Sequence, residues 1–338
     1  MHRLKIANLH KETPDTMTIR FELTDEYQKN YPFLAGQYVF VQKELEGKLY
    51  KRAYSITASP FSGDLQITVK ETATGDFSKY VNSALQTGDY LEVSEPKGNF
   101  VLPVDATHQK NYLGFATGSG IAPIYAMILA VLEKEPQSKF GLFYGNSTER
   151  HTIFKKQLDA LQSEFPDRFF VQYLYSQEVV QGAISGKINK ALVRYAVEKK
   201  FQGIDWEQFY ICGQEEMKEQ ISEALLEQEV SENKIFFELF TKPKKSDKVT
   251  MTITSEGETK EIIVPKTTTI LDAALDAGLD PSYSCQGGFC TSCMAKITEG
   301  QAVMEENATL NEDEIAEGKV LTCVARATTD QLNITFDV

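Results

Sequence analysis

Four of the five cysteines in this chain follow a spacing that suits iron–sulfur chemistry. Cys285, Cys290 and Cys293 are separated by four and two residues, and 29 residues lie between Cys293 and Cys323. Four thiolates at this spacing are typical of a plant-type [2Fe–2S] cluster. Small residues in the loop, such as Gly287, would let backbone N–H groups approach the cluster sulfurs. The sequence therefore predicts a [2Fe–2S] cluster on these four cysteines.

Two other kinds of metal site fit these cysteines less well. Structural zinc sites usually arrange their ligands as two close pairs, whereas here the fourth cysteine stands alone. A Rieske centre needs histidine ligands, and none of the four histidines lies near a cysteine in the sequence. The fifth cysteine, Cys212, lies outside the spacing, and a small buried side chain explains it as well as a role at a nicotinamide does.

A glycine-containing loop, residues 114–123, lies between an apolar strand pattern and a helical pattern. Gly118 and Gly120 would let the backbone approach a pyrophosphate, and Pro123 suits the first turn of a helix. Taken alone, the loop is equally typical of a tight turn, because the third glycine of the usual dinucleotide fingerprint is missing. A second glycine turn, at Gly213, also follows a strand pattern. We expect both turns at the carboxyl edge of one sheet, where α/β folds bind nucleotides.

A third constellation, Arg52-Ala53-Tyr54-Ser55, is followed by Gly75-Asp76-Phe77-Ser78. Arg52 can bind a phosphate, Tyr54 can cover an aromatic ring, and Ser55 can hydrogen-bond a ring nitrogen. Each of these residues alone is ordinary in a β-barrel, but their arrangement favours a flavin site.

The elements that must position these motifs predict a multidomain chain. Residues 1–106 alternate short strands, such as 33–41 and 65–69, with Gly and Pro turns, which indicates an antiparallel β-barrel. Residues 107–240 alternate strand and helix patterns, as in an α/β doubly wound parallel sheet. The expected strands are 112–116, 140–144, 169–175 and 208–212, and the expected helices are 123–133, 154–164, 187–198 and 215–229. A basic linker at 241–248 precedes residues 249–338, where we expect a hairpin at 249–264 and a helix at 269–277.

The combined patterns resemble a known superfamily. Arg-x-Tyr-Ser, Gly-x-x-Ser, Thr-Gly-x-Gly-x-x-Pro and Cys-Gly-x-x-x-Met, in this order, are similar to the ferredoxin-NADP reductase superfamily over residues 1–240. Residues 249–338 resemble a plant-type ferredoxin, which implies an α+β β-grasp fold. The fusion resembles reductase components of multicomponent oxygenases, in particular the phenylacetyl-CoA epoxidase type, with which it shares Tyr144-Gly145-Asn146 and Ile211-Cys212-Gly213.

This resemblance implies two cofactor sites and an electron donor. FAD would be held by Arg52, Ala53, Tyr54, Ser55, Gly75, Phe77 and Ser78, and the nicotinamide nucleotide by Thr117, Gly118, Gly120, Pro123, Cys212 and Gly213. Ser55, Cys212 and Phe240 would serve hydride transfer, with Phe240 stacking on the flavin until nicotinamide displaces it. Many NADP-dependent relatives have Ser-Arg where this chain has Ser176-Gln177. We therefore expect NADPH or NADH as donor, and the resemblance favours NADPH. Arg150 is then the candidate partner of the 2′-phosphate.

A hydride carries two electrons and a [2Fe–2S] cluster accepts one, so a flavin is expected between them. We therefore expect electrons to pass from NAD(P)H to FAD, to the cluster and to an oxygenase component in phenylacetate-type degradation. One alternative is the reductase of another mono- or dioxygenase. Another is an electron carrier that oxidises no nucleotide, which the nucleotide loop and flavin motif disfavour. The cysteine spacing also disfavours an electron-transfer protein of the dihydroorotate-dehydrogenase type.

Acidic residues gather in the C-terminal part. Residues 249–338 carry a net charge of −10 out of −13, which disfavours nucleic acid and acidic membranes and could steer a basic partner, or could serve solubility alone. The candidate docking residues are the acidic Glu305, Glu306, Glu312, Asp313 and Glu314. If the charge serves solubility alone, we expect docking through apolar contacts near the cluster loop, around Tyr283 and Phe289. No secretory signal and no apolar run of about 18 residues is found, so we expect a cytoplasmic protein with neither a membrane nor a nucleic-acid partner.

Overall fold

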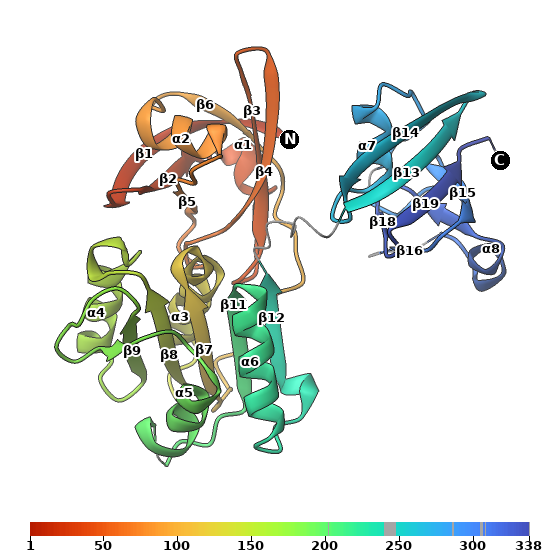
Figure 1. The fold of residues 1–338 in the computed structure, drawn as a ribbon. Helices are drawn as coiled ribbons and strands as arrows, with labels where there is room; N and C mark the ends of the chain where they lie inside the picture. Colours follow the sequence, from red (N-terminus) through yellow and green to blue (C-terminus); the bar gives the residue numbers. More distant parts are fainter. Residues whose placement is uncertain (202, 240–247, 286, 305–306, 308, 338) are drawn as a thin grey trace. The chain divides into compact units, whose positions relative to one another are not determined.

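The computed structural model describes residues 1–201, 203–239, 248–285, 287–304, 307 and 309–337 (Figure 1). The chain divides into two compact units, Met1–Phe240 and Thr241–Val338. Several predicted features lie outside the described residues: Phe240, the linker up to residue 247, Glu305 and Glu306, and the side chain of Glu312. No helix within the described ranges is long and apolar enough to cross a membrane.

The first part of unit one is the predicted antiparallel barrel. Six strands are ordered β4-β3-β6-β1-β2-β5, and an isolated bridge between Ile56 and Ile67 joins the end of β4 to β5. Alternate side chains, such as Leu4 and Ile6, fill the interior. The elements are β1 (His2–Thr13), β2 (Thr16–Glu22), α1 (Asp25–Gln28), β3 (Tyr38–Leu45), β4 (Lys48–Ser55), β5 (Leu65–Lys70), α2 (Asp76–Ser83) and β6 (Tyr90–Val93).

The strand predicted over residues 33–41 begins only at Tyr38. Gly36 has a φ of 104°, and a Cβ on it would lie 2.1 Å from the Phe100 carbonyl oxygen, so the chain turns here. Next to this turn, the Leu102 N–H donates to the Ala35 carbonyl at 3.0 Å. The turn therefore holds the barrel against the segment that leads into the nucleotide domain.

The second part of unit one is the predicted parallel sheet, ordered β10-β9-β8-β7-β11-β12. Strands β8, β9 and β10 lie on one side of β7, and β11 and β12 lie on the other. The strand order therefore reverses at β7, and α/β folds bind ligands at such a point. The predicted helix at 187–198 starts late because the Asn189 side chain caps it, and it ends in a single π turn. The elements are β7 (Asn111–Thr117), η1 (Gly118–Gly120), α3 (Ile121–Lys134), β8 (Lys139–Asn146), η2 (Glu149–His151), α4 (Lys155–Glu164), β9 (Phe169–Tyr175), β10 (Ile184–Ser185), α5 (Lys190–Tyr195), η3 (Ala196–Lys200), β11 (Gln208–Gly213), α6 (Glu215–Leu226), η4 (Glu232–Lys234) and β12 (Ile235–Leu239).

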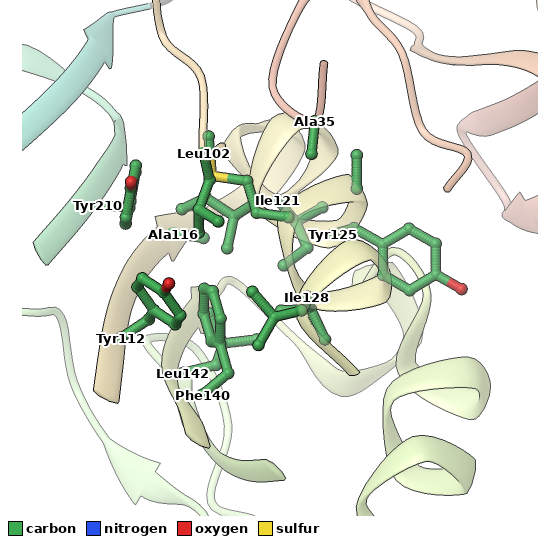
Figure 2. Close-up of a cluster of buried hydrophobic side chains, with 14 of the residues drawn as sticks. Ala35, Leu102, Tyr112, Ala116, Ile121, Tyr125, Ile128, Phe140, Leu142 and Tyr210 are labelled. Atoms are coloured by element: carbon green, nitrogen blue, oxygen red, sulfur yellow. The ribbon is translucent and has the colours of Figure 1, made fainter. Parts of the chain in front are cut away.

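Helix α3 carries apolar side chains on nearly all sides, and most of its residues are buried, as expected for such a helix. Figure 2 shows Tyr112, Phe140 and Leu142 of the sheet packing in one cluster with this helix. Ala35 and Leu102 reach the same cluster from the barrel turn and the connecting segment. The start of α3, which follows the nucleotide loop, is therefore held from both sides.

Unit two has a five-stranded mixed sheet, ordered β14-β13-β19-β15-β17, covered by a short helix, as expected for a β-grasp fold. The predicted hairpin is formed by β13 and β14, and Thr269 caps the predicted helix by accepting from the Asp272 N–H. The elements are β13 (Lys248–Ser255), β14 (Glu258–Pro265), α7 (Ile270–Asp276), β15 (Met294–Glu299), β16 (Ala302–Met304), α8 (Glu312–Ala316), β17 (Lys319–Leu321), β18 (Ala325–Ala327) and β19 (Gln331–Thr335).

Candidate functional site

The predicted flavin strand is the end of β4. Arg52 and Ala53 are exposed, and the backbone of Ala53 pairs with Phe40 of β3. Tyr54 is half-buried, its ring lies 6.0 Å from that of buried Phe77, and burial raises its pKa. Arg52 and Tyr54 are two residues apart and therefore share one face of the strand. On that face they can bind a phosphate and cover a ring.

The second flavin segment is the start of α2. The Tyr50 hydroxyl donates to Asp76 Oδ2 at 2.9 Å and ties this start to β4. The helix has no side-chain cap, so the N–H groups of its first turn are available to an anion. The Ser78 hydroxyl accepts from the Thr72 N–H at 3.1 Å and donates to the Gly75 carbonyl at 2.8 Å. The Ser78 side chain therefore shapes the turn, and a phosphate would meet backbone groups.

The two predicted nucleotide turns pack against each other at the carboxyl edge of β7 and β11. A Cβ on Gly120 would lie 2.2 Å from the Cys212 carbonyl oxygen, and a Cβ on Gly213 would lie 2.3 Å from Thr117 Oγ1. Gly118 differs, because its φ is 53° and nothing lies within 4 Å of a Cβ there. The turns meet as predicted, with open space beside Gly118.

The ends of β7 and β8 supply further groups to this edge. The Tyr144 hydroxyl donates to the Gly118 carbonyl at 2.9 Å and holds the loop. Pro123 is buried in the first turn of α3, where its missing N–H costs no hydrogen bond. The Asn146 side-chain nitrogen is buried with no hydrogen-bond partner among the described residues. Asn146 is therefore a candidate ligand contact that no motif assigned, although it lies in the Tyr144-Gly145-Asn146 stretch that contributed to the resemblance.

A half-buried glutamate, Glu238, lies near two of the predicted catalytic residues, Ser55 and Cys212. Glu238 of β12 lies in register with Cys212 of β11, and burial, with a smaller effect of Glu238, raises the pKa of that thiol. Burial also raises the pKa of Glu238 to about 7, against the lowering effect of the nearby Ser55 hydroxyl. Ser55 Oγ and Glu238 Oε2 are both buried, and neither has a partner in hydrogen-bond geometry within the described part of the chain.

Glu238 lies outside every motif recognised in the sequence. The signal that could have found it is a single charged residue inside the apolar strand Ile235–Leu239. Two unpartnered buried polar atoms need a ligand, and a polar ring edge such as that of a flavin fits them.

The segments that follow β8 and β9, at the carboxyl edge of the parallel sheet, carry charges of both signs. Arg150 is exposed on η2, and the Gln177 N–H donates to the Ser147 carbonyl at 3.0 Å, which brings the ends of β8 and β9 together. The Glu178 carboxylate accepts from the Glu149 N–H on the same edge. This edge therefore offers a cation for a 2′-phosphate and carboxylates for ribose hydroxyls.

The four predicted cluster ligands form two pairs. Cys290 Sγ donates to Cys285 Sγ at 3.2 Å, and hydrogen bonding with Cys285 lowers the pKa of Cys290 to about 6. Burial, and then interaction with Cys293, raise the pKa of Cys323 to about 12. Thr322 donates to the Cys293 carbonyl from its N–H at 3.1 Å and its hydroxyl at 2.8 Å. Among the residues with described positions, no three His, Cys, Asp or Glu side chains are grouped so that they could hold one metal ion.

Three segments match known domain families: "Oxidoreductase FAD-binding domain" at residues 3–102, "Oxidoreductase NAD-binding domain" at 115–223, and "2Fe-2S iron-sulfur cluster binding domain" at 253–328. The chain is also 33% identical to a component of the 1,2-phenylacetyl-CoA epoxidase of Escherichia coli (strain K12), over 99% of this chain and 98% of that protein. The chain belongs to the family of FAD- and [2Fe–2S]-dependent reductases.

Two further matches of this FAD- and [2Fe–2S]-dependent reductase are consistent with the family assignment. The 3-ketosteroid-9-alpha-monooxygenase ferredoxin reductase component of Rhodococcus rhodochrous is 29% identical over 98% of this chain and 96% of that protein. The solved structure of phthalate dioxygenase reductase has a TM-score of 0.63 at 24% identity, and the match covers 99% of this chain and 97% of that one, which confirms the predicted fold.

The reductase is an NAD(P)H-dependent oxidoreductase with FAD and a [2Fe–2S] cluster, as predicted. When bound, FAD would supply the conversion between two-electron and one-electron transfer, and the cluster would supply one-electron transfer. The residues present fit both groups. The Ser55 hydroxyl, which lacks a hydrogen-bond partner in the described part of the chain, suits the flavin, and the paired thiols suit the cluster.

Proposed function

We propose that this chain takes a hydride from NAD(P)H beside Ser55, Cys212 and Glu238 and passes single electrons through its cluster to an oxygenase component. The domains would be 1–106 for FAD, 107–240 for the nucleotide and 249–338 for the cluster. The observation that carries the proposal is that Ser55 Oγ and Glu238 Oε2 are buried near each other, with no partner in hydrogen-bond geometry among the described residues.

Each group has a distinct part in this proposal. Arg52 and the first turn of α2 hold the FAD diphosphate, Tyr54 covers one ring face, and Ser55 donates to a ring nitrogen. The loop from Gly118 and the start of α3 hold the nucleotide diphosphate. Cys212 stays neutral because burial raises its pKa, so it is a small uncharged neighbour for nicotinamide. Glu238 holds a proton beside the ring edge, and hydride transfer needs no nucleophile.

The proposed acceptor is an oxygenase of phenylacetate-type degradation. This choice is supported by the similarity to the Escherichia coli epoxidase component. A steroid monooxygenase is the second candidate, favoured by the similarity to the 3-ketosteroid-9-alpha-monooxygenase components. A cytoplasmic location belongs to the same proposal, because a reducing compartment keeps the cluster thiols free to bind iron.

Purified protein tests the proposal in two stages. The first stage measures FAD, iron and acid-labile sulfide, and then cluster reduction by NADPH and by NADH. The second adds the catalytic components of phenylacetyl-CoA epoxidase, or separately the oxygenase of the steroid system, and measures oxygenated product. We expect product only with the epoxidase components. Product only with the steroid oxygenase would change the acceptor, and zinc without sulfide would contradict the electron path.

A further inference from the structure

Tyr144 ends a row of buried side chains on one face of β8. Phe140, Leu142 and Tyr144 alternate along this strand, and all three lie in the same core cluster as α3. All three are fully buried, and Tyr144 is the member nearest the carboxyl end of the strand. A hydroxyl adds nothing to apolar packing, so the hydrogen bonds of Tyr144 define what it does there.

The Tyr144 hydroxyl holds the peptide plane between Gly118 and Ser119. It donates to the Gly118 carbonyl at 2.9 Å, and the same carbonyl accepts from the Ile121 N–H. This peptide bond is trans, so its C=O and its N–H point in opposite directions. Because the carbonyl is turned toward the buried Tyr144, the Ser119 N–H points away from the core.

Gly118 is the position in the loop at which this peptide plane could turn over. Its φ is 53°, and nothing lies within 4 Å of a Cβ there. Glycine adopts positive and negative φ with similar ease, so the hydrogen bonds to its carbonyl hold the plane. In the reversed plane, a carbonyl oxygen would replace the Ser119 N–H, and a bound diphosphate would meet an acceptor where it needs a donor.

The groups around the Tyr144 oxygen direct its hydrogen toward the loop. Burial raises the pKa of Tyr144, while the nearby Asn146 side chain and Ile153 backbone lower it. Groups that lower the pKa of a phenol do so by favouring its charged oxygen, as hydrogen-bond donors do. A hydroxyl has one hydrogen to donate, and with donors on its acceptor side that hydrogen remains for the Gly118 carbonyl.

We propose that Tyr144 is a positioning residue for the nucleotide, because its hydroxyl holds the Gly118–Ser119 peptide plane so that the Ser119 N–H faces the diphosphate of NAD(P)H. This inference rests on the proposed function, which puts the diphosphate at the Gly118 loop. NADH and NADPH share the diphosphate, so the hydroxyl serves both donors equally. It acts on nucleotide binding and leaves the hydride step unchanged.

Tyr144→Phe removes the hydroxyl and keeps the packed ring. The Gly118 carbonyl retains the Ile121 N–H as a donor, so we expect the variant to fold. Stopped-flow reduction of the flavin gives a half-saturating nucleotide concentration and a limiting rate. We expect the half-saturating concentration to rise about tenfold for both NADH and NADPH, with the limiting rate unchanged. N-benzyl dihydronicotinamide carries no diphosphate, so its rate of flavin reduction should equal that of the wild-type protein.

Tyr112→Phe is the matched control. Tyr112 is equally buried in the same core cluster, but it lies at the amino end of β7, and its hydroxyl donates to Glu135 Oε2 at 2.9 Å. The Glu135 carboxylate retains the Asp105 N–H as a donor. This variant loses the same chemical group from the same core, and it should leave both half-saturating concentrations at the wild-type value.

The outcomes separate this inference from the proposed function. Unchanged half-saturating concentrations in Tyr144→Phe, a rise for NADPH alone, or an equal slowing with N-benzyl dihydronicotinamide would overturn the inference. A wild-type flavin that neither nucleotide reduces contradicts the proposed function and the inference with it.

A second pair of variants applies if Tyr144→Phe loses FAD or does not fold. Gly118→Val and Gly118→Asn add side chains of similar size to the same open space, but asparagine tolerates a positive φ and valine does not. Valine should therefore raise the half-saturating concentration about tenfold more than asparagine. Equal effects of the two substitutions would show that the orientation of this peptide plane does not matter, and would overturn the inference.

Discussion

Replacing Glu238 with glutamine tests whether the carboxyl group beside Ser55 is neutral near neutral pH. Burial raises its pKa from 4.5 to about 7, so the native protein holds the proton more tightly than the unfolded chain does. The stability that the neutral carboxyl contributes is fully present below pH 4.5 and is lost as the pH rises through 7. Between pH 5 and pH 8 the loss amounts to about 2.5 kcal/mol, at about 1.4 kcal/mol per pKa unit.

Urea unfolding of flavin-free protein across this pH range provides the assay. Trp206 is the only tryptophan of the chain, and it is buried with its ring 5.4 Å from that of Phe201 in the nucleotide domain, so its fluorescence reports this domain. Between pH 5 and pH 8, the free energy of unfolding of the wild-type protein should fall by about 2.5 kcal/mol relative to that of Glu238→Gln. Ser55→Ala should move this loss to higher pH, because Ser55 lowers the pKa of Glu238.

If the free energies of unfolding of wild type and Glu238→Gln change with pH in the same way, to within about 0.5 kcal/mol, this reasoning is refuted. The carboxyl group would then be ionised throughout the range and solvated in a way that its burial does not predict. Glutamine is nearly isosteric with glutamate, so a uniform offset at all pH values reports packing and leaves the slope as the test.

Three further predictions concern the cluster, the nucleotide loop and the nucleotide. Cys290→Ser should abolish the cluster absorbance and delivery to cytochrome c but preserve NAD(P)H reduction of a two-electron dye; losing both with FAD bound would contradict the relay. Gly120→Ala should destabilise the protein by about 3 kcal/mol in urea unfolding, at the upper end for overpacking, because its Cβ would meet the Cys212 carbonyl oxygen at 2.2 Å. The control Gly118→Ala, in open space, should cost about 1 kcal/mol, and an equal cost for both would refute the packing argument. Arg150→Ala should lower kcat/KM for NADPH about tenfold and spare NADH; an equal loss for both would remove Arg150 from the 2′-phosphate site.

Sequence alone was sufficient for features made within one segment of chain. The cysteine spacing indicated a cluster, and the helix capped by Thr269 and the hairpin before it appear where their patterns predicted them. These features depend on bonds between residues close in sequence, so local order determines them. The turn at Gly36 marks the limit, because its contact with the distant Phe100 carbonyl ends the expected strand early.

Only the tertiary structure decided which polar groups meet at the site. Ser55 comes from a barrel strand and Glu238 from the edge of the parallel sheet, and no spacing in the sequence relates them. The tertiary structure also adds bonds that the motif did not predict, since the Ser78 hydroxyl accepts from Thr72 and donates to Gly75 within its own turn. The pKa of Glu238 depends on burial that arises when the barrel and the sheet pack together, and a linear sequence carries no measure of that burial.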